Sequence, residues 1–191
     1  PREDYERLYQ LWNENGNSRY VLSRSSQNYS DNNHCTTIRD ANTTLIKPYQ
    51  KDLDIPHGVN IDIFPLDGYP NSKIKRMIQM GWSCIHSLFC TGCVPQTHGK
   101  VIKVTSMILL KLFPGKKIRY KIWNLAERQM SKYKIQDCQY ITELCVGPKY
   151  MKNRYPKEAF SHAIWLNFED TKMPVPAGYD AYLKIAFGDY M

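Results

Sequence analysis

Apolar side chains near the start of the chain recur with the spacing of an α-helix. They lie at positions i, i+3, i+4 and i+7, and acidic residues fill the first turn. The four apolar positions are Tyr5, Leu8, Tyr9 and Trp12. This pattern predicts a helix over residues 2–15, and Gly16 is the expected stop.

Short runs rich in β-branched residues follow and are typical of strands. They cover residues 20–22, 35–39 and 43–47, and a turn-forming Asp-Ala-Asn separates the last two. We therefore expect those two runs to form a hairpin. The polar residues 23–33 between the first two runs predict a surface loop that lines or covers a site, or that is a simple connection.

The most strand-like run of the chain is residues 59–64, which Pro65 closes. Asp67 and Gly68 then predict a turn, as does the Pro-Asn pair at 70–71. Beyond this point the pattern becomes helical. Ser72 is a plausible N-cap, and helices are expected over about 73–90, 100–113 and 116–134.

The last part of the chain mixes both kinds of element. Strands are expected near 140–142 and 163–168, a Pro-Val-Pro linker at 174–176, and a final helix over about 177–187. The order predicts an α+β fold in one domain. Residues 1–70 and 135–191 would form a catalytic layer, and residues 71–134 a helical insert.

Charge separates the same three segments. The 191 residues carry a formal charge of +8, with 42% hydrophobic side chains, which is enough core for one domain and excludes a disordered tail. Residues 71–134 hold 13 basic and 1 acidic side chains, whereas the segments on either side are slightly acidic. The excess charge therefore belongs to the insert, not to the whole chain.

Several classes of protein are disfavoured by composition. The longest apolar stretches are broken by polar or lysine residues, so a membrane-spanning helix is not expected, and no secretory signal opens the chain. Six unevenly spaced cysteines argue for a reducing compartment. Cys90 and Cys93, with His98 after them, have the spacing of a zinc or redox pair, but buried free thiols are the simpler interpretation.

Asp62 is the strongest candidate for chemistry. In a strand it would share one face with Asn60 and Phe64, while Ile61 and Ile63 anchor the other face to a core. A carboxylate in such surroundings is costly unless it is paired or binds a metal. The alternative is a buried Asp that accepts hydrogen bonds from backbone amides or an Arg.

Other charged residues are weaker candidates. Arg39 and Lys47 stand at strand ends and would reach phosphate oxygens, although a surface salt bridge explains either one equally well. Asp52 and Asp54 have the spacing for a shared metal ion, but a solvated acidic pair is the simpler interpretation. The turn is enough to explain Asp67. At best, its side chain would position residues that bind the ligand without contacting the ligand itself.

Residues 54–68 closely resemble the LicD family of phosphotransferases. The chain contains the family's Gly followed by Ile-Asp-Ile-Phe-Pro-Leu-Asp, which here runs from Ile61 to Asp67 after Gly58. Its first residues resemble the helix after the family's Asp-rich strand. Its end, Phe187-Gly-Asp-Tyr-Met191 after the Pro-rich stretch, resembles the C-terminal signature.

The resemblance implies a nucleotidyltransferase-like fold with a mixed sheet. It also implies transfer of a substituted phosphate, usually phosphocholine from CDP-choline, to a hydroxyl of a surface glycan or lipid-linked glycan. Fukutin-like relatives transfer ribitol phosphate instead. Three carboxylates hold divalent metal, Mg²⁺ or Mn²⁺, and only the third maps here, onto Asp62. Because the Asp-x-Asp pair is expected before Pro1, we expect the sheet to be incomplete at its N-terminal end and the 191-residue chain alone to be inactive.

A different class of function is a non-catalytic basic module. The positive insert, with Trp82 and Trp123, would bind an anionic membrane or nucleic acid. Membrane contact ranks first, because aromatic and apolar residues accompany the lysines, and no nucleic-acid partner is expected for the enzyme. These interpretations together predict a cytoplasmic protein with peripheral contact on the inner face of the cell membrane.

Overall fold

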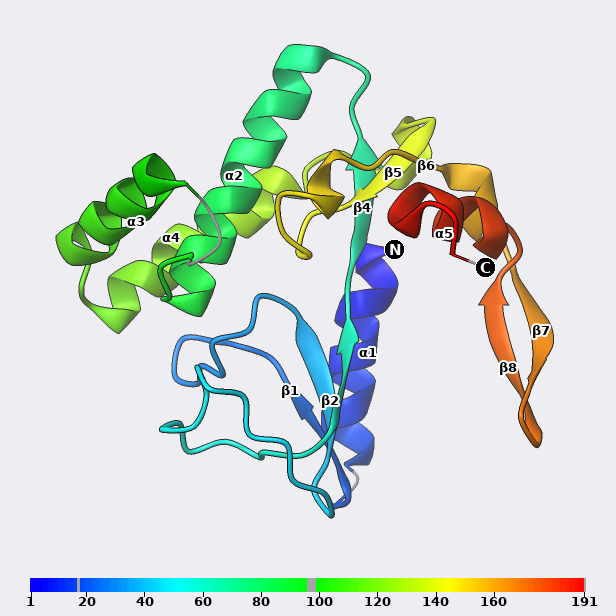
Figure 1. Ribbon diagram of the computed structural model, residues 1–191, viewed down its shortest axis with the longest axis horizontal. Helices are drawn as coiled ribbons and strands as arrows, with labels where there is room; N and C mark the ends of the chain where they lie inside the picture. The colour runs from blue at the N-terminus through cyan, green and yellow to red at the C-terminus, as the bar shows by residue number, and fades with distance from the viewer. Residues whose placement is uncertain (17, 96–98, 191) are drawn as a thin grey trace.

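The computed structural model describes residues 1–16, 18–95 and 99–190. Within these ranges the fold is α+β, as predicted, with five α-helices and three small antiparallel sheets. Figure 1 shows the helices α2, α3 and α4 on one side and the last hairpin on the other. The strands lie in separate antiparallel sheets, so the nucleotidyltransferase-like arrangement stays a prediction.

The first helix and the first sheet follow the sequence pattern closely. Helix α1 covers Arg2–Asn15 and ends at Gly16, as expected. Strands β1 (Tyr20–Ser23), β2 (Thr36–Asp40) and β3 (Asn60–Ile63) form an antiparallel sheet in which β2 is central.

The hairpin expected from residues 35–39 and 43–47 was wrong. Residues 43–47 form no strand, and β2 pairs with β3 instead. Gly58 explains this choice, because a Cβ there would lie 2.1 Å from the carbonyl oxygen of Asp40. The close approach brings the end of the 41–59 segment against β2, where the amide of Asp40 donates to the carbonyl of Val59 at 2.9 Å.

The turn expected at Asp67 and Gly68 was also wrong, because both residues lie in a strand. β4 (Leu66–Tyr69) pairs with β5 (Tyr140–Glu143), which pairs with β6 (Tyr155–Pro156). Gly68 is needed for a close approach, since a Cβ would lie 2.6 Å from the carbonyl oxygen of Tyr133. The glycine therefore marks close backbone packing inside a sheet.

The three helices of the basic segment form as predicted. They are α2 (Lys73–Thr91), α3 (Lys100–Leu112) and α4 (Lys116–Met130), the last ending four residues earlier than expected. Ser72 caps α2, since its side chain accepts from the amide of Lys75. Trp123 of α4 packs with Leu88 and Phe89 of α2 in a buried cluster. No helix among the described residues is long and apolar enough to cross a membrane.

One expectation for the C-terminal part of the chain was wrong. β7 (Ala163–Phe168) and β8 (Thr171–Pro176) form a hairpin, so the expected 174–176 linker is a strand. Prolines fit there because a two-stranded sheet consists of edge strands only. Helix α5 (Tyr179–Phe187) then packs Tyr182 against Tyr155 of β6. Short 3₁₀ turns complete the chain at Ile135–Asp137, Tyr150–Lys152 and Lys157–Phe160.

Candidate functional site

A buried polar cluster lies beside the central strand of the first sheet. The side chains of Arg39 on β2 and Asp31 in the preceding loop are both fully buried, and their nearest charged atoms are 3.6 Å apart. All three guanidinium nitrogens of Arg39, and Oδ2 of Asp31, have no hydrogen-bond partner in the described structure. Buried polar atoms without hydrogen bonds are costly even within an ion pair, so such an arrangement is typical of a site that binds a polar ligand.

The loop between β1 and β2 fixes the carboxylate of this cluster. Oδ1 of Asp31 accepts from the hydroxyl of Ser25 at 2.9 Å and from the amide of Asn33 at 3.1 Å. Gln50, also fully buried, donates to the carbonyl of Asp31, while its own Oε1 has no partner in the described structure. The polar loop at residues 23–33 therefore lines a buried site, which is one of the two roles expected for it.

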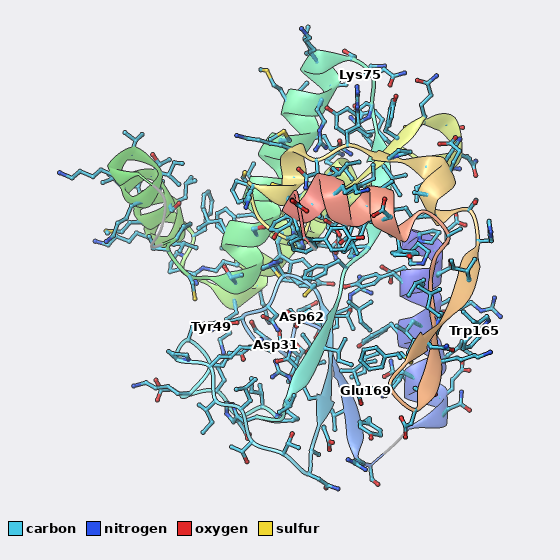
Figure 2. All side chains as sticks on the ribbon, turned by 45° about the vertical axis from the view of Figure 1, so that its right-hand side comes forward. Asp31, Tyr49, Asp62, Lys75, Trp165 and Glu169 are labelled. Carbon is cyan, nitrogen blue, oxygen red and sulfur yellow. The ribbon has the colours of Figure 1, made fainter. Side chains whose placement is uncertain are left out.

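Asp62 lies on the same face of the sheet as Arg39. In the β2–β3 ladder, Thr37 is opposite Asp62 and Arg39 is opposite Asn60, and directly opposite residues point to one side. Asn60 also donates through Nδ2 to Oδ1 of Asp62 at 2.5 Å. Figure 2 shows Asp31 and Asp62 in the same part of the molecule, near Tyr49.

The third candidate, Lys47, affects the pKa of a histidine that Asp62 and Asp31 also affect. Burial lowers the pKa of His34, the carboxylates of Asp62 and Asp31 oppose this, and the charge of Lys47 lowers it further. Burial and then the charge of Asp62 raise the pKa of Tyr49, which Arg39 opposes. The charge of Lys47 therefore acts on the same histidine as the charges of Asp62 and Asp31, and its place beside Arg39 stays a prediction.

Two details of the prediction for Asp62 were wrong. Its side chain is exposed instead of buried, and Ile61, expected to anchor the strand to a core, is 70% exposed. β3 is an edge strand of its sheet, and neither of its faces is fully buried. Arg39 also differs from expectation, because it is a buried ion-pair partner and not a strand-end surface residue.

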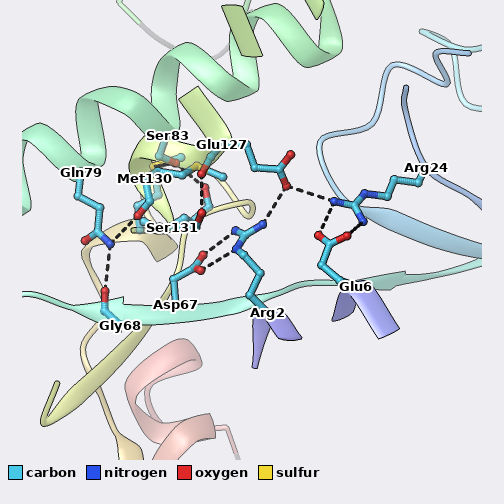
Figure 3. Close-up of polar contacts among 12 residues, drawn as sticks. Arg2, Glu6, Arg24, Asp67, Gly68, Gln79, Ser83, Glu127, Met130 and Ser131 are labelled. Carbon is cyan, nitrogen blue, oxygen red and sulfur yellow. Dashed lines mark hydrogen bonds and ion pairs between the residues drawn. The ribbon is translucent and has the colours of Figure 1, made fainter. Parts of the chain in front are cut away.

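A second charged group connects the first helix to β4, to α4 and to the loop after β1. Arg2 of α1 donates from Nε and a terminal nitrogen to the two carboxylate oxygens of Asp67 at 2.8 and 2.7 Å, and to Glu127 of α4 at 2.8 Å (Figure 3). Arg24 contacts Glu127 at 3.4 Å and donates two hydrogen bonds to Glu6 of α1.

These contacts explain the titration of their central carboxylate. Burial alone would raise the pKa of Glu127. The charge of His86, followed by those of Arg2 and Arg24, outweighs this effect, so the pKa is lowered. For Asp67, burial raises the pKa and the hydrogen bonds from Arg2 oppose that rise. The network holds α1, β4, α4 and the loop after β1 together around the site.

Comparison with known proteins gives one informative relative. The chain is 29% identical over 195 aligned residues to the lipopolysaccharide cholinephosphotransferase LicD of Haemophilus influenzae, covering 100% of the chain and 71% of the relative. This similarity supports membership in the LicD family. No family model matches the chain. No solved structure matches it either.

The LicD resemblance led to Asp62 but not to Asp31 or Gln50. Both lie outside the helices and strands, and only the chain's path brings Asp31 beside Arg39 and Gln50 against the backbone of Asp31. A sequence signal for Asp31 was present in its polar loop, since a run of Ser, Asn and Asp residues can turn inward as well as outward. Asp52 and Asp54 are exposed, which fits the solvated pair.

A divalent metal is implied by the LicD resemblance, and the described residues fit it only in part. Among them, no group of three or more His, Cys, Asp and Glu side chains gathers closely enough to hold an ion. Asp62 offers one exposed carboxylate. The two cysteines of the suggested zinc pair have different surroundings. Cys90 is buried and donates to the carbonyl of Asn33, whereas Cys93 is exposed. His98 lies outside the described residues.

Proposed function

We propose that this chain transfers choline phosphate from CDP-choline to a hydroxyl group of lipopolysaccharide, in a reaction assisted by Mg²⁺ or Mn²⁺. The relative's name describes choline phosphate transfer to lipopolysaccharide. The observation that carries the proposal is the buried guanidinium of Arg39, whose three nitrogens have no hydrogen-bond partner in the described structure, on the same sheet face as the exposed carboxylate of Asp62. An arginine and a carboxylate on one face suit phosphoryl transfer to a hydroxyl.

The reaction forms a bond between the acceptor oxygen and the phosphorus that carries choline. The bond from that phosphorus to the oxygen of CMP breaks, and CMP leaves with the electron pair. Negative charge grows on the transferring oxygens, where guanidinium donors stabilise it. We assign this role to Arg39, with Lys47 adding positive charge nearby. Asp62 accepts the proton that the acceptor hydroxyl loses.

We propose that access to Arg39 involves a movement of the 41–59 segment. Gln50 of this segment donates to the backbone of Asp31, and the charge of Arg39 acts on the neighbouring Tyr49. Because Arg39 is fully buried, we propose that donor phosphate reaches it when this segment moves outward. The metal would add further charge stabilisation, with Asp62 as one ligand and the remaining ligands supplied from outside the described residues.

We place the reaction in the cytoplasm, at the inner face of the cell membrane. The six cysteines of the described chain are all free, which is typical of a reducing compartment. A nucleotide-activated donor and an acceptor built on lipid would meet at that surface.

The test measures CMP release from CDP-choline in the presence of lipopolysaccharide, using the natural full-length protein. Asp62→Asn should lower kcat by about 100-fold or more, since it removes a proton acceptor. Asp52→Asn is the matched control, because it removes one exposed carboxylate from a nearby segment and should leave kcat unchanged. Full activity of Asp62→Asn would overturn the assignment.

A second variant tests the role of the guanidinium. Arg39→Lys keeps the charge opposite Asp31 but loses the planar donor set, so the KM for CDP-choline should rise about 10- to 100-fold. Chelation of divalent ions should abolish turnover, and Mg²⁺ or Mn²⁺ should restore it. An unchanged KM would refute the role of Arg39, and turnover that survives chelation would refute metal assistance.

A further inference from the structure

Helix α3 is apolar on the side that faces away from the protein. Its inner side is fixed by Leu110 and Ser106, which are buried. On the opposite side lies a stripe of four apolar residues at helical spacing, each between 52% and 79% exposed. The stripe consists of Val101, Val104, Ile108 and Leu112. A helix with apolar residues on both sides is ordinarily covered on both, so the outer stripe requires a partner.

Exposed lysines accompany this stripe along α3 and into α4, and no carboxylate in residues 99–121 offsets them. Three are in α3 itself and three in the first turns of α4, and all six are exposed. They are Lys100, Lys103, Lys111, Lys116, Lys117 and Lys121. Residues 99–121 contain no Asp or Glu. The surface therefore combines exposed apolar side chains with a dense positive charge, which is the composition of helices that lie in the plane of an anionic membrane.

The neighbouring structure extends the apolar surface. Val101 and Ile102 also line a pocket of about 410 Å³ between α2 and α3, whose other walls include Leu88 and Leu109. At the other end of the stripe, Phe113 and Ile118 are exposed beside the first lysines of α4. Figure 1 shows α3 at the outer edge of the molecule, at the end opposite the β7–β8 hairpin.

We propose that the outer face of α3, with the first turns of α4, docks on an anionic phospholipid bilayer. The helix has 13 residues and lies along the surface, with its apolar stripe in the acyl boundary and its lysines at the headgroups. Charge excludes a second copy of the chain as the occupant. A symmetric dimer through this face would bring the same six lysines of each copy together, and such juxtaposition is repulsive.

The experiment is flotation of the full-length protein with vesicles of phosphatidylcholine, with or without phosphatidylglycerol. Binding should occur only with phosphatidylglycerol and should weaken as salt is raised. Each of the substitutions Lys100→Gln and Lys111→Gln should lower the partition coefficient about fivefold, converted from about 1 kcal/mol per lysine at an anionic surface. Ile108→Asp should lower it at least about tenfold.

The matched control is Trp165→Asp, which places the same charge on an apolar side chain that is 66% exposed at the far end of the molecule. It should bind vesicles like the unmodified protein. Circular dichroism checks that each variant is folded, and the lysine variants remain informative if Ile108→Asp is not. Unchanged partitioning of the lysine and Ile108 variants would overturn the proposal. So would equal binding to neutral vesicles, or a dimer in the absence of lipid that Ile108→Asp abolishes.

Discussion

Acid should destabilise this protein through one buried histidine. His86 lies in α2, 2% exposed, with the edge of its ring against Trp123 at 5.9 Å between centroids. Its Nδ1 has no hydrogen-bond partner in the described structure. Burial lowers the pKa of His86 from 6.5 to about 4, so the ring is neutral in the folded protein near neutral pH. Between these two pKa values, His86 therefore binds a proton in the unfolded chain but not in the folded protein.

The sign and size of the effect follow from this difference. Above pH 6.5 neither state is protonated, and the free energy of unfolding keeps its full value. As pH falls from about 6.5 to 4, only the unfolded chain gains the proton, so stability is lost. At about 1.36 kcal/mol per pH unit, the loss attributable to His86 approaches about 3 kcal/mol at the lower end.

Urea unfolding across this pH range measures the loss. His86→Gln should be less stable than the original protein near neutral pH but should lose about 2 to 3 kcal/mol less on acidification. His162→Gln, which alters an exposed histidine, should follow the original curve. Burial also lowers the pKa of His34, but this residue is present in every variant and cancels in the comparison. Parallel curves for the original protein and His86→Gln would refute the reasoning.

Two further predictions concern stability and are measured by denaturant unfolding. Arg2→Met should cost about 3 to 5 kcal/mol, because it leaves the buried carboxylate of Asp67 unpaired, and adding Asp67→Leu should recover most of the loss. A double variant no more stable than Arg2→Met would contradict this. Gly68→Ala should cost about 1 to 3 kcal/mol, because the new methyl group meets two backbone carbonyls below 3.0 Å. Gly81→Ala, where nothing lies within 4 Å in α2, should instead stabilise by about 1 kcal/mol, and equal effects at both glycines would argue against the packing explanation.

The sequence predicted elements well where the hydrophobic pattern was long or the cap specific. Helix α1 and the N-cap of α2 at Ser72 were confirmed. One error occurred where a glycine had two explanations. Gly68 was interpreted as a turn residue, but it permits the backbone at 133–134 to approach β4. Such close packing depends on residues more than 60 positions away, which local pattern cannot reveal.

The candidate site was predictable in part. The strand pattern and then the resemblance both led to Asp62, and strand alternation placed it beside Asn60, which the structure confirms. Its exposure was not predicted, because alternation identifies the two faces of a strand but not whether another element covers them. Asp31 became part of the site only through the fold, since the loop that carries it turns inward.

The position of β4 has a consequence for how this protein folds while the ribosome synthesises it. The strands β1, β2 and β3 can pair as soon as they emerge, whereas β4, complete at Tyr69, waits for β5, which ends at Glu143. At about 5–20 residues per second, that delay is on the order of 4 to 15 s. During it the nascent chain exposes an unpaired strand edge. Helix α2 emerges in the interval, and in the folded protein its Gln79 donates to the carbonyl of Gly68 in β4, so this contact is available to the strand before β5 is made.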